Sequence, residues 1–177
     1  MDNDESQKDF IKFWSHISLN TGDETLIVLK GHLLLEDLMS EYCSSKVEDE
    51  KPFNEARLSF AQLICMVKAM QKIKPSEWVW PAVKKVNALR NKLAHKLTPK
   101  DYEKSRDEFI DFVKKSQESE KLFTSFKKKH EHLAVAIFIV HTALSVNLRF
   151  KPHGILTLAM ALDDSESSNK SPNPDAQ

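Results

Sequence analysis

Three neighbouring side chains in the middle of the chain could together act on a phosphate group. Arg90 and Asn91 are adjacent, and His95 follows the amide by four residues. An arginine is a permanent cation with several donors, an asparagine amide both donates and accepts hydrogen bonds, and an imidazole exchanges protons near neutral pH. These are the groups that phosphodiester cleavage without a metal ion requires. We take these three residues as the candidate catalytic residues.

The helix that must position these residues is predicted from about 76 to 97. Its apolar residues have helical spacing and form one stripe that faces a core: Val79, Val83, Val86, Leu89, Leu93 and Leu97. Arg90 lies at the edge of this stripe, whereas Asn87, Asn91 and His95 form a polar row at steps of four. Because Arg90 and His95 are about 140° apart around the axis, one helix supplies half a site. Two copies related by a two-fold axis would supply a whole one, so we expect a homodimer.

The same helix is basic although the chain as a whole is neutral. Residues 77–97 contain five cations and one acid, whereas the whole chain has 26 basic and 26 acidic residues. Such a patch attracts a polyanion locally. Trp78 and Trp80, at the start of the helix, either stack on bases or pack between helix ends. The candidate RNA-binding lysines are Lys84, Lys92 and Lys96.

The string from Arg90 to His95, with its lead-in 86–89, resembles the motif of the HEPN superfamily of helical ribonucleases and nucleic-acid-associated domains. In that motif an arginine is followed by a polar residue and, after a gap of four to six residues, by a histidine near the end of a helix. The resemblance implies a small helical bundle that dimerises to cleave RNA without a metal or cofactor, as in bacterial toxins and phage-defence effectors. It implies Arg90, Asn91 and His95 as the functional residues.

A second resemblance keeps a non-catalytic alternative open. The segment 30–38 is similar to an early helix of the mannitol operon repressor group, which is helical and regulatory. This likeness implies a domain that binds a protein partner, in which Arg90 pairs with Glu36 and His95 caps the end of its helix. A third alternative, a nucleotide sensor that uses the same cleft, lacks an accompanying glycine-rich phosphate loop.

A helix earlier in the chain, predicted over 23–44, carries Glu36, which we expect to support the site together with Asn87. It is apolar over most of its circumference, so we expect it at the centre of the bundle. Glu36 lies in a polar row within it and needs a partner. Either it pairs with Arg90 and fixes that side chain, or it reaches solvent at the helix boundary. His32, four residues earlier, can hydrogen-bond to Glu36, but no third ligand is spaced to form a metal site.

Composition and periodicity predict an all-α fold. The 177 residues, 41% hydrophobic and 29% charged, suit one globular domain, and three glycines with few alternating runs argue against strands. We expect a single-domain antiparallel, HEPN-like bundle of about five to six helices over 1–162 and a disordered polar tail over 163–177. The predicted helices are 5–19, 23–44, 54–71, 76–97, 98–118 and one from about 121.

The sequence also predicts the cellular location and the partners of the protein. The acidic, polar start is unlike a signal peptide, and two isolated cysteines fit a reducing cytoplasm. The apolar run 133–148 is short of a membrane span and belongs to a core or dimer-interface helix. The expected partners are RNA, a second copy of the chain, and an antitoxin or regulatory protein, with no membrane.

Overall fold

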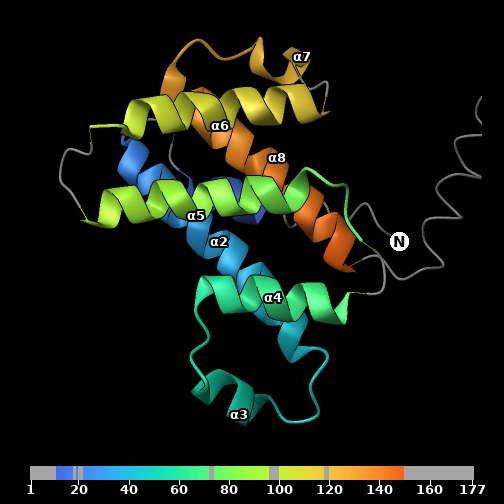
Figure 1. The fold of residues 1–177 in the computed structure, drawn as a ribbon. Coiled ribbons are helices and arrows are strands. Elements are labelled where there is room, and N and C mark those ends of the chain that lie inside the picture. The colour runs from blue at the N-terminus through green and yellow to red at the C-terminus, as the bar shows by residue number, and fades with distance from the viewer. Residues whose placement is uncertain are drawn as a thin grey trace, which may run out of the picture.

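The computed structural model describes residues 11–17, 19, 22–71, 74–95, 100–117 and 120–149. This part of the chain contains helices and no β-strand, which confirms the all-α prediction (Figure 1). The helices are α2 (Glu24–Ser44), α3 (Glu50–Glu55), α4 (Phe60–Met70), α5 (Val79–His95), α6 (Tyr102–Gln117), α7 (Glu120–Phe123) and α8 (Lys129–Arg149). Residues 11–16 are also helical. The polar tail predicted at 163–177 lies outside the described residues.

The helices are arranged in two layers. Figure 1 shows α4, α5 and α6 lying across α2 and α8, and contacts between elements join α2 to α8, α4 and α5, and α8 to α5 and α6. Helix α2 packs tightly on α8 at Gly31, where an added Cβ would lie 2.6 Å from Cγ2 of Ile137. Glycine is therefore required at this crossing. The central position predicted for the early helix is correct.

The apolar helix α8 belongs to the core of this bundle. Its segment Lys129–Leu148 is long and apolar enough to cross a membrane by length and composition, but 61% of it is buried inside the structure. Ile137, Val140 and Leu144 have no exposed surface. A helix that is apolar around its circumference and packed on several neighbours is typical of a protein core.

Several helices begin later than predicted, and capping side chains explain two of these differences. The helix expected to begin at 54 begins only at Phe60, where Ser59 forms a capping box with Gln62, and the residues before it form a separate short helix, α3, which Asp49 caps. Between them Arg57 has a φ of 46°, a left-handed conformation that no helix continues through. Likewise, the helix expected from 121 is interrupted before α8, where the carboxylate of Glu131 accepts hydrogen bonds from two backbone amides.

Candidate functional site

Helix α5 is held by its apolar stripe, as predicted. Val79, Val83 and Val86 are fully buried, Leu89 is 1% exposed, and Leu93 packs against the same core. The two tryptophans at the start of α5 pack as well, Trp80 buried and Trp78 against the core. These contacts fix the rotation of the helix about its own axis, so the polar residues beside the stripe lie at the rim between α5 and α2.

A group of five polar residues, which we call the α2–α5 cluster, occupies this rim. Its members are His32 and Glu36 on α2 and Asn87, Arg90 and Asn91 on α5. The cluster includes four of the residues singled out from the sequence as catalytic or supporting. His32, which was considered only as a partner for Glu36, is at its centre.

The imidazole of His32 is buried and contacted on three sides. Its Nε2 lies 3.1 Å from Oδ1 of Asn87, and its Nδ1 lies 3.6 Å from Oε2 of Glu36. The ring stacks on Phe60 of α4, with 4.1 Å between centroids and 27° between planes. The buried ring is therefore fixed in position, and Asn87 of the predicted polar row points toward α2.

Arg90 and Asn91 form the outer part of the cluster. Both are half-buried, and Nη1 of Arg90 donates a hydrogen bond of 3.2 Å to Oδ1 of Asn91. Among the residues whose side chains the structure describes, no carboxylate lies within 4 Å of the guanidinium. The side chain of Glu36 is 32% exposed and contacts His32 rather than Arg90, although the charge of Arg90 acts on Glu36 through space.

The environment shifts the pKa values of Glu36 and His32 toward each other. Burial raises the pKa of Glu36, and the charge of Asp37 adds to this, while the positive charge of Arg90 opposes it. Burial lowers the pKa of His32; the hydrogen bond with Asn87 opposes this shift, and the charge of Arg90 adds to it.

The remaining candidates are placed only in part. Lys84 is exposed and Lys92 is half-buried on α5, while Lys96 lies outside the described residues. His95 is the final residue of α5, and its side chain is not among those described. The backbone thus puts His95 four residues beyond Asn91 on the same helix, as the sequence predicted.

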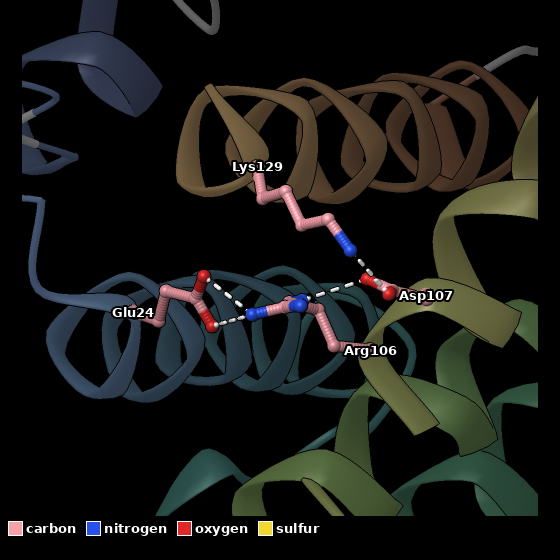
Figure 2. A network of polar contacts seen from close by, with 4 residues as sticks. All are labelled: Glu24, Arg106, Asp107 and Lys129. Atoms are coloured by element: carbon pink, nitrogen blue, oxygen red, sulfur yellow. Dashed lines mark hydrogen bonds and ion pairs between the residues drawn. The ribbon is translucent and has the colours of Figure 1, made fainter. Parts of the chain in front are cut away.

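A second polar group, which we call the Arg106 network, joins α2, α6 and α8. In Figure 2 the guanidinium of Arg106 lies between two carboxylates: its Nη1 contacts both oxygens of Glu24 at 2.8 and 2.9 Å, and its Nε contacts Asp107 at 2.9 Å. Lys129 of α8 binds the other oxygen of Asp107 at 2.6 Å. This network was not predicted from the sequence. One feature of the sequence does indicate it. Arg106 follows Tyr102 by four residues and precedes Phe109 by three, which places the arginine on the inward face of α6.

Arg106 and Arg90 differ in how their charges are paired. Burial acts to lower the pKa of Arg106, but the hydrogen bonds to Asp107 and Glu24 outweigh it and raise the pKa. The hydrogen bond from Arg106 holds the pKa of Asp107 below its usual value. Partial burial of Asp107 opposes this shift, and the hydrogen bond from Lys129 adds to it. The Arg106 network is an ion-pair network that joins three helices, whereas Arg90 has one hydrogen bond, to a neutral amide, among the described residues.

Within the described part of the chain, no three His, Cys, Asp or Glu side chains gather in a way that could hold a metal ion. Comparison with protein-family models, with curated proteins and with solved structures gave no match.

Proposed function

We propose that the protein is a metal-independent endoribonuclease of the HEPN type, acting in a toxin–antitoxin or phage-defence system in the cytoplasm. The observation that carries the proposal is the half-buried guanidinium of Arg90, which bonds to the neutral amide of Asn91 and to no described carboxylate. A partly desolvated cation without an anionic partner favours binding of an oxyanion. A phosphodiester supplies one, and the basic residues along α5 favour a polyanionic substrate.

The reaction that suits these groups is attack of an RNA 2′-oxygen on the adjacent phosphorus. Arg90 neutralises charge on the phosphoryl oxygens, Asn91 orients the phosphate or the arginine, and His95 transfers a proton as general acid or base. Lys84, Lys92 and Lys96 bind the RNA backbone. The products are a 2′,3′-cyclic phosphate and a 5′-hydroxyl. Arg90 and His95 diverge around α5, so the complete site requires a second copy of the chain.

The test is RNA cleavage by the full chain in the presence of EDTA. Wild type is compared with Arg90→Ala and His95→Ala, and His16→Ala serves as the matched control because His16 is an exposed histidine on another segment. We expect chelator-insensitive cleavage by wild type and His16→Ala, and a loss of about 10²- to 10⁴-fold in His95→Ala. Equal cleavage by His95→Ala and wild type, or cleavage that EDTA abolishes, would contradict the proposal.

A second function, a regulatory domain that acts through protein partners like the mannitol operon repressor group, is favoured by one observation. Asn87 contacts the buried ring of His32 at 3.1 Å, so part of the polar row on α5 serves packing inside one protomer. If the whole motif is structural in this sense, Arg90→Ala and His95→Ala lower the thermal midpoint and leave RNA intact in every sample. Sedimentation of the purified chain tests the dimer that the nuclease requires and the regulator does not.

A further inference from the structure

The proposed cleavage moves two protons, one from the attacking 2′-hydroxyl and one to the leaving 5′-oxygen, and each copy of the motif on α5 supplies one proton-transfer group, His95. We propose that Glu36 of α2 is the general base that accepts the proton of the 2′-hydroxyl, and that His32 is the positioning residue that holds Glu36. This inference rests on the proposed ribonuclease function and adds a catalytic residue to it from a different helix.

The exposure of the two side chains fits these roles. The side chain of Glu36 is 32% exposed, so its carboxylate can reach a substrate at the rim, whereas that of His32 is 6% exposed and faces the interior. His32 is fixed by Asn87 at 3.1 Å and by the stack on Phe60 at 4.1 Å, and its Nδ1 lies 3.6 Å from the carboxylate. A base held by a rigid buried group loses less freedom when the substrate binds.

Glu36 is linked to the part of α5 that carries Arg90: it contacts His32, and His32 contacts Asn87, which lies one helical turn before Arg90. In a reactive conformation the 2′-oxygen lies about 3–3.5 Å from the phosphorus that it attacks. A base for this hydroxyl must therefore lie beside the group that binds the phosphate. The charged or titratable groups that act on Glu36 are His32 and Asp37 from α2 and Arg90 from α5, and α4 contributes the uncharged Phe60. Glu36 is the carboxylate of the cluster that has both a buried support and the charge of Arg90 nearby.

The proton balance of the step is complete without a further reactant. The 2′-oxygen forms a bond to phosphorus as its proton passes to the carboxylate of Glu36, and the bond from phosphorus to the 5′-oxygen breaks. The leaving 5′-oxygen takes a proton from the imidazolium of His95. Glu36 then releases its proton to solvent, and His95 regains one. Burial, which raises the pKa of Glu36 despite the charge of Arg90, makes its carboxylate a stronger base.

The kinetic test measures kcat and KM for one RNA oligonucleotide from acid to neutral pH in EDTA. Glu36→Gln is compared with Asp37→Asn, a matched control that removes one carboxylate at the exposed neighbouring position of the same helix. We expect Glu36→Gln to lower kcat by about 10²- to 10⁴-fold, to leave KM unchanged and to remove the acid limb of the pH profile. Asp37→Asn retains both. Glu36→Asp, which keeps a carboxylate, restores an acid limb.

A second measurement tests the contact with His32 without relying on activity. Titration of the His32 ring by NMR is expected to give a lower pKa in Glu36→Gln than in wild type, because the anion 3.6 Å from Nδ1 is lost. Asp37→Asn is expected to have a smaller effect. An unchanged His32 titration in Glu36→Gln would overturn the positioning role.

The outcomes separate this inference from the function on which it rests. If Glu36→Gln keeps the wild-type kcat and acid limb while Arg90→Ala and His95→Ala are inactive, the base is a different group, and the nuclease proposal stands. If Glu36→Gln loses activity with a lowered thermal midpoint and a normal acid limb in the residual activity, Glu36 is structural and the inference is overturned. If wild type shows no chelator-insensitive cleavage, both proposals are wrong.

Discussion

Two arginines beside α2 show how the same side chain is used in opposite ways. Arg106 is buried and satisfied, with three hydrogen bonds to two carboxylates. Arg90 is half-buried and donates one hydrogen bond to a neutral amide among the described residues. The charge of Arg106 is therefore paired inside the fold, whereas that of Arg90 has no carboxylate partner among the described residues. An arginine whose charge is not paired within the protomer, rather than any arginine, marks the candidate site.

The carboxylates of the two regions have pKa values that are shifted in opposite directions. The pKa of Asp107 is lowered by its bond to Arg106, so ionisation of Asp107 favours the folded state at neutral pH. The pKa of Glu36 is raised by burial, so its ionisation opposes folding. A group that lowers stability and lies at the surface is typical of a functional site.

The largest expected difference is in the free energy of unfolding of arginine variants. Arg106→Met leaves Glu24 without its cation and Asp107 with Lys129 alone, and we expect a loss of about 3 kcal/mol, the low end for breaking a buried pair because both carboxylates stay partly hydrated. Arg90→Met is expected to lower it by less than about 1 kcal/mol. Urea unfolding of both variants measures the difference. Equal losses would mean that Arg90 is also satisfied inside the protomer.

An intermediate effect is expected from the two asparagines of α5. Asn87→Ala removes the partner of the buried Nε2 of His32, which is expected to lower the free energy of unfolding by about 1–3 kcal/mol. Asn91→Ala, at the outer part of the cluster, is expected to lower it by less than about 1 kcal/mol and to reduce RNA turnover. Thermal unfolding and cleavage assays on the same samples check both. A larger loss of stability in Asn91→Ala than in Asn87→Ala would contradict the assignment of Asn87 to the inner part of the cluster and Asn91 to the outer part.

The smallest effect is a difference in pH dependence between the two carboxylates. The pKa of Asp107 is lower in the folded state, so its contribution to stability is present at neutral pH and is lost as the pH falls through that lowered pKa, below about 4. Asp107→Asn should thus lower the free energy of unfolding by up to about 1 kcal/mol at neutral pH and by less in acid.

Glu36 has the opposite sign. Its folded-state pKa is raised, so the folded state binds a proton more tightly and loses stability as the pH rises through the shifted value. Glu36→Gln is expected to leave stability at neutral pH unchanged or higher. Urea unfolding at neutral pH and near pH 3 measures both variants. A destabilisation by Glu36→Gln that matches Asp107→Asn would remove the distinction between the two regions.

Much of the fold follows from local patterns. The helix predicted over 23–44 is α2, with Asp23 as its capping residue. Of the stripe predicted from Val79 to Leu97, the residues up to Leu93 pack on the core, and Leu97 lies outside the described residues. The errors at α3 and before α8 are also local, because the capping side chains of Ser59 and Glu131 interrupt segments that periodicity alone makes continuous. Periodicity reports which face is apolar, and a cap decides where the helix begins.

The sequence by itself determined the helices, their buried faces and the types of residue at the motif, because these depend on spacing along one chain segment. Only the tertiary structure decided which polar groups are satisfied. Asn87 meets His32 across 55 residues, and Arg106 meets Glu24 across 82. Such pairs depend on how two helices cross. The spacing of a charged residue along its own helix is the same whether or not a partner on another helix pairs with it, so the sequence alone does not show which charges are paired.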